Sequence, residues 1–289
     1  MHQADVKSAL VLEGGAKRGI YTAGVLDVLL ENEIIVNGIF GVSAGAIHGC
    51  SYASRQIGRS IRYTQKYNND YRFMSWRSLL LTGNMVETKF SYHTLPEKLD
   101  PYDNATFMQQ DMAFYAVCSN VKTGQPEYIQ CRDMFKDIDV IRASASMPLV
   151  SQIVDVQGKK LLDGGITDSI PVDAAFQKGF NKNIVVLTRP KNYRKKSVNT
   201  LVKFLVKRIY RKYPKFVQAI IDRPQMYNVQ VARVEELEKT GQILVIRPSR
   251  KINISRMERN LDVIKQMYHL GRTDAQKMLP QIQSFLSDK

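Results

Sequence analysis

The first part of the chain alternates between short apolar runs and longer segments with apolar residues every three or four positions. Lys7–Leu12 and residues 183–188 have the length and the β-branched content of buried strands. Residues 20–32 repeat apolar positions at the spacing of a helix that packs one face on a core. Strands alternating with helices predict an α/β fold, in which helices flank both faces of a mostly parallel sheet.

The same pattern predicts most of the remaining elements. Further strands are predicted over residues 34–40, 112–120, 126–131, 160–163 and 243–248, and further helices over residues 44–55, 59–74, 139–145 and 172–178. Residues 77–111 contain Pro96 and Pro101 and show no clear period, so we expect irregular structure there.

The C-terminal part has a different character. Residues 200–221 form a candidate basic amphipathic helix, broken near Pro214. Two capping-box patterns, Ser255-x-x-Glu258 and Thr273-x-x-Gln276, predict two C-terminal helices separated by Gly271. We therefore expect a large α/β domain over residues 1–190, a basic amphipathic segment over 191–222 and a small, mainly helical α/β extension over 223–289, packed on the first domain.

Composition and charge narrow the class of protein. The 289 residues carry a formal net charge of +15, and residues 189–215 contain eleven Lys or Arg and no acidic residue. Three scattered cysteines give neither a disulfide framework nor a Cys-x-x-Cys metal site, and we expect buried thiols in a reducing compartment. No secretory signal is evident, and no apolar run approaches the roughly 20 residues of a membrane span. A cytoplasmic protein is expected.

One short motif suggests nucleophilic chemistry. In the stretch GIFGVSAGAIHG, Ser43 stands between a predicted strand and a predicted helix, with Gly41 and Gly45 two positions away on either side. Such a turn exposes the serine hydroxyl, and the two glycines allow the strand and the helix to approach closely. A purely structural turn is the alternative. The strand before Ser43 and the small residues after it favour a nucleophile.

A second glycine-rich loop, EGGAKRG over residues 13–19, also joins a strand to a helix. Its spacing resembles a P-loop, but Ile20 and Tyr21 stand where Lys and Ser or Thr are needed, and no dinucleotide-binding pattern of glycines is present. What remains is a loop of exposed backbone N–H groups at a helix N-terminus. This is the chemistry of an oxyanion hole.

The proton acceptor for Ser43 is harder to find. The chain has four histidines, His2, His48, His93 and His269. None is convincing, although His269 has the Ser…Asp…His chain order of α/β-hydrolases, because it falls inside a predicted helix. The other candidate is Asp163, which ends a predicted strand and is followed by Gly164 and Gly165. Asp-Gly-Gly alone is also a common structural turn.

Taken together, EGGAKRG, GVSAG and DGG, in this order and spacing, resemble the patatin-like phospholipase family, and bacterial patatin-like proteins in particular. VIRASASMP and DGGITDSIP are also similar to that family, so the resemblance covers roughly residues 7–190. It implies a three-layer fold and a Ser–Asp dyad without histidine. Ser43 would then be the nucleophile and Asp163 the base.

The resemblance also assigns the loop residues. Gly14, Gly15 and Ala16 match the oxyanion loop, and Arg18 matches its usual basic position. The family pattern commonly begins Asp-Gly-Gly-Gly, where this chain has Glu13 and ends the run with Ala16. Alanine keeps its N–H, so it can serve in the hole if its φ is negative. The resemblance implies no metal and no cofactor.

Three functions are in competition. The first is a serine lipid acyl hydrolase, a carboxylic ester hydrolase that acts on phospholipid, lysophospholipid or another fatty acyl ester through an acyl-enzyme. The second is an acyltransferase or thioesterase that uses the same dyad. The third is a catalytically idle, basic regulatory or binding protein, suggested by the charge of +15. Because no RNA-binding or zinc-finger pattern appears, nucleic acid is not an expected partner.

The basic segment allows two interpretations. Apolar residues recur at three- and four-residue spacing, and basic residues occupy much of the remaining circumference: Leu201, Leu205, Ile209, Tyr213 and Phe216 on one side, Lys203, Lys207, Arg208, Arg211 and Lys212 on the other. Either the apolar side packs on the core, or the helix docks the protein on anionic lipid, which would place it at the inner face of the membrane.

Overall fold

The computed structural model describes residues 6–287 and contains an eight-stranded sheet at its centre. The strand order is β5-β6-β3-β2-β1-β7-β8, with β4 paired to β3. The strands are β1 (Lys7–Leu12), β2 (Gly38–Val42), β3 (Ala113–Asn120), β4 (Pro126–Cys131), β5 (Val154–Val156), β6 (Lys159–Asp163), β7 (Phe180–Val186) and β8 (Ile243–Ile246). The pairs β3–β4, β3–β6 and β5–β6 are antiparallel and the other four pairs are parallel, so the prediction of a mostly parallel sheet is confirmed.

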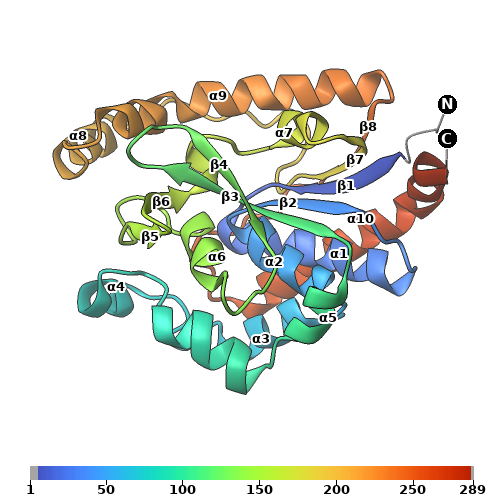
Figure 1. Ribbon diagram of the computed structural model, residues 1–289, viewed down its shortest axis with the longest axis horizontal. Helices are drawn as coiled ribbons and strands as arrows, with labels where there is room; N and C mark the ends of the chain where they lie inside the picture. Colours follow the sequence, from blue (N-terminus) through green and yellow to red (C-terminus); the bar gives the residue numbers. More distant parts are fainter. Residues whose placement is uncertain (1–5, 288–289) are drawn as a thin grey trace.

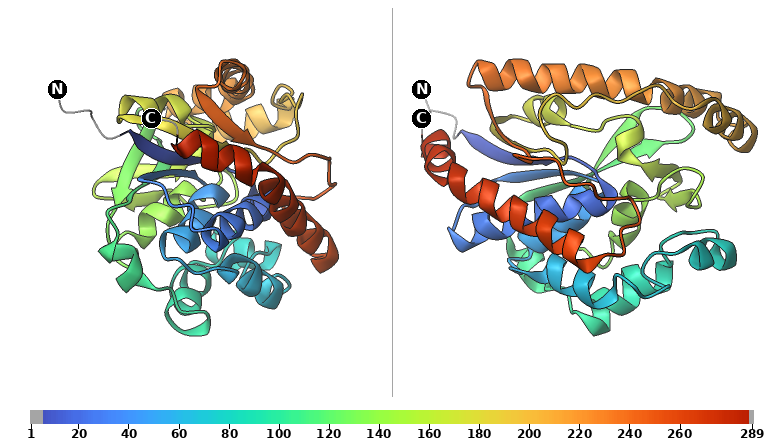
Figure 2. Two further views of the ribbon diagram at one scale, coloured as in Figure 1. Left: turned by 90° about the vertical axis from the view of Figure 1, so that its right-hand side faces the viewer. Right: turned by 180° about the vertical axis from the view of Figure 1, so that it is seen from behind.

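Helices cover both faces of the sheet (Figures 1 and 2), as the apolar strands require. Leu10 and Leu12 of β1 pack against α1, α2, α6 and α10, whereas Ala9 and Val11 pack against α7 and α9. Because successive side chains of a strand point to opposite faces, a continuous apolar run such as β1 needs a layer on each side. The three-layer α/β fold is confirmed.

The helices that cover the sheet vary in length from one turn to more than seven turns. They are α1 (Ile20–Glu31), α2 (Ala44–Ala53), α3 (Arg59–Tyr67), α4 (Trp76–Thr82), α5 (Asn104–Gln109), α6 (Ile138–Ser144), α7 (Val172–Gln177), α8 (Thr200–Ile209), α9 (Pro214–Lys239) and α10 (Leu261–Ser287). Within the described residues no helix is long and apolar enough to cross a membrane. The three cysteines are buried and free, as predicted.

The prediction of two C-terminal helices is wrong, because α10 continues through Gly271 without a break. Gly271 is needed for close packing on α1: a Cβ at this position would lie 2.1 Å from the carbonyl oxygen of Tyr21. Gly24 of α1 has the same role, since its Cβ would lie 2.2 Å from the carbonyl oxygen of Tyr268. A glycine that resembles a helix stop in the sequence is here a helix contact.

The prediction of irregular structure over residues 77–111 is also wrong. This region contains part of α4, a π-helical segment (Phe90–Leu99) and α5. The side chains of Ser75 and Asp103 cap α4 and α5 by accepting from the N–H groups of Ser78 and Thr106. These helices have only one or two turns, and the π-helical segment has a wider period, so a search for the ordinary helical repeat misses them.

The C-terminal third is joined to the same sheet. The predicted helix over residues 200–221 is two helices, since α8 ends at Ile209 and α9 begins at Pro214, and the predicted break near Pro214 is confirmed. Strand β8 pairs with β7 at the edge of the sheet, with Val185 opposite Val245. The division of the chain at residues 190 and 222 stays a prediction.

Candidate active site

The predicted site residues gather where the parallel strands end. Ser43 follows β2 directly, and Glu13 and the glycine-rich loop follow β1. Strand β6 runs antiparallel to β3 and places Asp163 opposite Cys118, at the same edge of the sheet. In open α/β sheets the carboxyl ends of the strands are where ligands bind. The fold therefore brings together three segments that lie far apart in the sequence.

Ser43 occupies a strained elbow between β2 and α2. Its φ of +53° and ψ of −119° are rare for a residue with a side chain. A Cβ on Gly41 would lie 2.5 Å from the Cα of Ala46, and one on Gly45 would lie 2.3 Å from the carbonyl oxygen of Leu12. Both glycines are therefore required for the sharp turn.

A second serine supports this elbow. The backbone N–H of Ser43 donates to Oγ of Ser144 at 2.9 Å, and that hydroxyl donates to the carbonyl oxygen of Val117 at 2.7 Å. Ser144 is fully buried and lies on α6. Sequence reasoning missed its contact, although the stretch VIRASASMP, which resembles the family, contains this residue.

Asp163 is buried, and only one of its two carboxylate oxygens has a hydrogen-bond partner among the described residues. Its Oδ1 accepts from the N–H of Gly165 at 2.8 Å, whereas its buried Oδ2 has no hydrogen-bond partner among the described residues. The hydroxyl of Ser43 is close enough to lower the pKa of Asp163 as a side-chain donor, without the full geometry of a hydrogen bond. A Cβ on Gly164 would lie 2.1 Å from the carbonyl oxygen of Val117, so only glycine fits in this turn.

Two opposing influences act on the pKa of Asp163. Burial raises the pKa of its carboxyl above the ordinary value, and the guanidinium of Arg223 is the main opposing influence. Arg223 lies on α9 and donates from Nε to the carbonyl oxygen of Gly165. A carboxyl whose pKa is raised is a stronger base once it is ionised. Nothing in the sequence pattern of the long helix α9 had singled out Arg223.

The glycine-rich loop lies against the serine. A Cβ on Gly14 would lie 3.0 Å from the Cβ of Ser43. Within residues 6–287 the N–H groups of Gly14, Gly15 and Ala16 donate no hydrogen bond. The φ of Ala16 is +48°, so the condition under which Ala16 could serve in the oxyanion hole, a negative φ, is not met. The chain must leave β1 and enter a 3-10 turn (Ala16–Gly19) within a few residues, and alanine accepts left-handed strain of roughly 1–2 kcal/mol there.

Glu13 holds the base of this loop in place. Its carboxylate accepts from the N–H of Thr188 at 2.6 Å and from the hydroxyl of Tyr227 at 2.9 Å. Thr188 follows β7 and Tyr227 belongs to α9. The acidic residue that opens the loop therefore ties together the ends of two strands and a helix of the opposite layer, which fixes the neighbouring backbone.

Basic side chains lie around the site. Burial lowers the pKa of Arg18 to about 10 and, further from the loop, that of Lys195 to about 6. Nε of Arg18 is buried without a hydrogen-bond partner among the described residues. Lys195 lies 3.6 Å from the ring centroid of Tyr227, and it also lines a groove of about 530 Å³ along one face of α9. Because a pKa of about 6 leaves Lys195 mostly neutral at pH 7, Arg223 is the main positive charge that acts on Asp163.

The described histidines do not approach this arrangement. His48 is buried and shares a hydrogen bond of 3.0 Å with Ser60, and burial lowers its pKa to about 3. His93 pairs with Glu97 at 3.3 Å on the surface. His269 lies on an exposed face of α10. His2 lies outside the described residues.

The basic residues of α8 and of the turn after it differ in exposure. Lys207, Arg208, Arg211 and Lys212 are exposed, and Lys203 is half-buried beside the groove along α9. The interpretation that the apolar side of the basic segment packs on the core is wrong for three of the five apolar residues, because Leu201, Leu205 and Ile209 are exposed. Val206 and Tyr210 pack inward instead.

An α/β sheet with a serine at a strand-to-helix elbow, beside a glycine-rich loop, is the arrangement of hydrolases that use a serine nucleophile. The family can be stated more closely. The chain belongs to the patatin-like phospholipase family, whose model matches residues 10–176. A domain of unknown function, DUF6363, matches residues 213–287.

Several known proteins are similar to this chain. The uncharacterized protein YjjU of Escherichia coli is 25% identical over 97% of this chain and 79% of its own length. Lysophospholipase nte1 of Aspergillus fumigatus is 29% identical over 61% of this chain, which is 11% of that much longer protein. VipD from Legionella pneumophila superposes with a TM-score of 0.47 at 11% identity, over 96% of this chain and 67% of VipD. Membership of the patatin-like phospholipase family supports a lipid hydrolase.

Proposed function

We propose that the protein hydrolyses fatty acyl esters of lipids through a Ser–Asp dyad and an acyl-enzyme. The observation that carries this proposal is the buried, unpartnered Oδ2 of Asp163 beside the hydroxyl of Ser43. A carboxylate in that position can accept a proton from the serine as the serine attacks.

In the first half of the reaction, Oγ of Ser43 bonds to the carbonyl carbon of the ester, and its proton passes to Oδ2 of Asp163. The carbonyl oxygen becomes an oxyanion, and the N–H groups of Gly14 and Gly15, which donate no hydrogen bond among the described residues, would stabilise it. The tetrahedral intermediate collapses when the bond to the alcohol oxygen breaks. Asp163 returns its proton to that oxygen, which leaves the acyl group on Ser43.

The second half repeats these steps with water. Asp163, ionised again, takes a proton from a water molecule as its oxygen attacks the acyl carbon. The bond to Oγ of Ser43 then breaks, the serine recovers its proton from Asp163, and the fatty acid leaves. One carboxyl group thus serves as base and acid in each half, which requires that its pKa be tuned by burial and by Arg223.

Arg223 gives this mechanism a pH signature. Arg223→Gln should move the acidic limb of the profile of kcat/KM against pH to higher pH. The substitution removes a positive charge that lowers the pKa of Asp163, and the reaction needs Asp163 ionised. Arg223→Lys keeps the charge and should keep the limb in place. Equal loss of activity at every pH, with an unmoved limb, would mean that Arg223 only holds the loop of Gly165.

Covalent labelling tests the nucleophile directly. A fluorophosphonate probe should label the wild-type protein at Ser43, because the activated hydroxyl attacks phosphorus as it attacks a carbonyl carbon. Peptide mapping by mass spectrometry locates the label, and Ser43→Ala, which lacks the hydroxyl, should not be labelled. A label on another serine, or none on active protein, would exclude Ser43 as the nucleophile.

A further inference from the structure

Helix α4 presents large apolar side chains to solvent. Trp76 is 61% exposed, Leu80 86% and Leu81 70%. The helix is nevertheless well fixed, because Ser75 caps it and Ser78 turns inward, where its hydroxyl donates to the carbonyl oxygen of Asn84 at 2.8 Å. These apolar groups are therefore held outward by the fold.

Helix α8 has the same property. Leu201 is 65% exposed, and Phe204 and Ile209 are each 58% exposed. The inward side of this helix is supplied by Val206 and Tyr210, which pack on a cluster with α9. The helix is thus apolar on its outer side as well, although its stability does not require this.

The two helices lie at the same end of the molecule (Figures 1 and 2). Both views place α4 and α8 on either side of the hairpin formed by β5 and β6, and β6 ends at Asp163. This is also the end at which β1 and β2 finish, beside Ser43. Helices α4 and α8 therefore lie on either side of the end of the molecule toward which β1 and β2 run.

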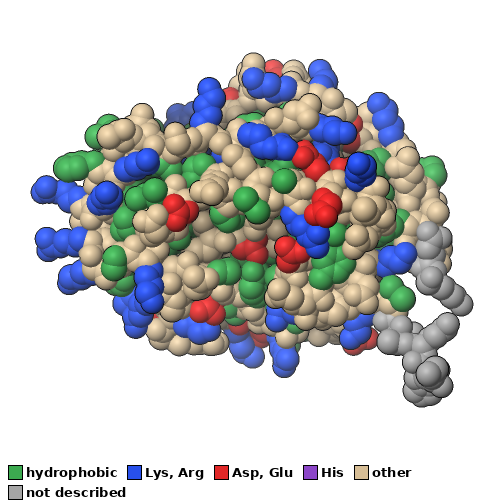
Figure 3. Space-filling model, turned by 90° about the horizontal axis from the view of Figure 1, so that it is seen from above, with side chains coloured by type: hydrophobic (Ala, Val, Ile, Leu, Met, Phe, Trp, Pro, Cys, Tyr) green, Lys and Arg blue, Asp and Glu red, His purple; other side chains and the backbone are tan. Residues whose placement is uncertain are grey.

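The surroundings of these side chains are basic. Lys207, Arg208, Arg211 and Lys212 are exposed, and within the described part of the chain they form no ion pair. On the other helix, exposed Arg77 lies 4.3 Å from the ring centroid of Tyr71. Figure 3 shows basic and hydrophobic side chains side by side at this end, seen from above. Anionic groups complement such a surface.

We propose that α4 and α8 dock this end of the protein on an anionic lipid bilayer, with Trp76, Leu80, Leu81, Leu201, Phe204 and Ile209 inserted at the interface. A bilayer accepts apolar side chains at two separate points at once, and its headgroups attract the cations around them. The inference rests on the proposed lipid hydrolysis for its purpose, since docking would bring the ester to Ser43. Besides α8, the second membrane contact is α4, which lies more than 100 residues before the basic segment in the sequence.

The experiment uses the one tryptophan of the chain, Trp76, as its probe. The full chain carrying Ser43→Ala, which cannot consume lipid by the proposed mechanism, is mixed at low salt with vesicles of phosphatidylcholine with or without phosphatidylglycerol. With phosphatidylglycerol we expect the emission to shift to shorter wavelength, and lipids brominated in the acyl chain to quench it. High salt should weaken binding, because it screens the charges.

Matched variants separate the contribution of the apolar side chains to binding from that of the basic side chains. Leu80→Ser with Leu81→Ser should lower the vesicle affinity at least about tenfold, because two apolar side chains no longer enter the interface. Lys207→Glu with Arg211→Glu should abolish binding to anionic vesicles in co-sedimentation. Lys239→Glu with Lys265→Glu makes the same change of net charge on exposed residues of α9 and α10 and should bind as the parent does. In the otherwise wild-type chain, all three pairs should retain hydrolysis of a soluble p-nitrophenyl ester.

Unchanged Trp76 emission with phosphatidylglycerol vesicles at low salt would overturn the inference. So would equal binding to neutral and anionic vesicles, or a dimer in light scattering that Leu80→Ser with Leu81→Ser dissociates, since the surface would then serve a second copy of the chain. Docking without esterase activity in the wild-type protein would instead refute the proposed function and leave the docking intact.

Discussion

Replacing Ser43 by alanine should reduce ester hydrolysis at least about 10⁴-fold, because the acyl-enzyme can no longer form. Asp163→Asn should cost about 10²–10⁴-fold, the usual contribution of a general base. Both are measured as kcat/KM on a soluble p-nitrophenyl ester. These are the largest effects that we expect on activity.

Asp163→Asn should also change the stability of the folded protein. Asparagine can still accept from the N–H of Gly165, and it removes a buried carboxyl whose pKa is raised by burial. A raised pKa means that the ionised group opposes folding at neutral pH, so Asp163→Asn should unfold at the same or a higher denaturant concentration. Near-normal turnover of Asp163→Asn, together with loss of activity in His269→Ala, would assign the base to histidine instead.

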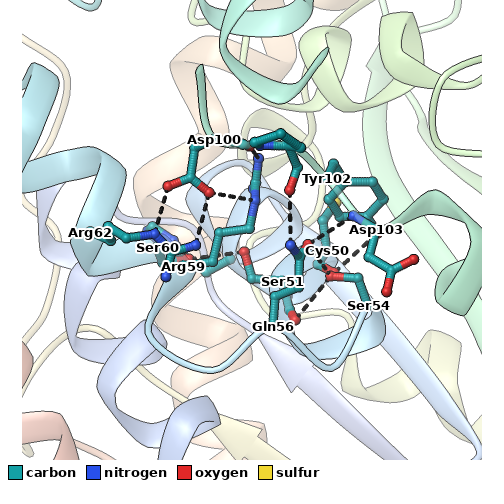
Figure 4. Close-up of polar contacts among 12 residues, drawn as sticks. Cys50, Ser51, Ser54, Gln56, Arg59, Ser60, Arg62, Asp100, Tyr102 and Asp103 are labelled. Atoms are coloured by element: carbon teal, nitrogen blue, oxygen red, sulfur yellow. Dashed lines mark hydrogen bonds and ion pairs between the residues drawn. The ribbon is translucent and has the colours of Figure 1, made fainter. Parts of the chain in front are cut away.

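Asp100→Ala should lower the free energy of unfolding by about 3–5 kcal/mol, the usual effect of breaking a buried ion pair. Arg59, 5% exposed, lies 3.4 Å from the carboxylate of Asp100, and Arg62 donates to both of its oxygens at 2.8 and 2.9 Å (Figure 4). Removing the carboxylate leaves the buried charge of Arg59 without its counterion. Urea denaturation followed by circular dichroism measures the loss.

Asp70→Ala is the matched control. Asp70 also pairs with an arginine, Arg72, at 2.7 Å, but the side chain of Arg72 is 46% exposed. Surface pairs of this kind contribute less than about 1 kcal/mol, so this variant should be nearly as stable as the wild type. If the two variants lost equal stability, burial of Arg59 would not be the cause.

Local pattern in the sequence was sufficient to predict seven of the eight strands, all except β5, and the layers of the fold. Residues 9–12 of β1 and 184–186 of β7 are continuously apolar, because both faces of these strands are covered. Ser43 could be found from its glycines. A sharp elbow between strand and helix needs glycine on both sides, so the backbone geometry is visible in the residues themselves.

What the sequence did not reveal depends on contacts between distant segments. Arg223 reaches the loop of Gly165 from α9, 58 residues further along the chain, and nothing local distinguishes it from the other cations there. Ser144, at the end of α6, accepts from the N–H of Ser43 and donates to the carbonyl oxygen of Val117 in β3, and again no local pattern in the sequence marks it. Gly271 was misread because close helix packing and helix termination both select glycine.

The contact between α1 and α10 affects how the protein is made. Every residue of α1 from Ile20 to Leu30 is buried, and α10, which begins at Leu261, covers one side of it. On the ribosome α1 emerges about 230 residues before α10, so its apolar surface stays open while the intervening segment is translated. The segment that matches the family model ends at residue 176, well before α10. That segment is therefore a unit of family resemblance, whereas the unit of folding includes α10.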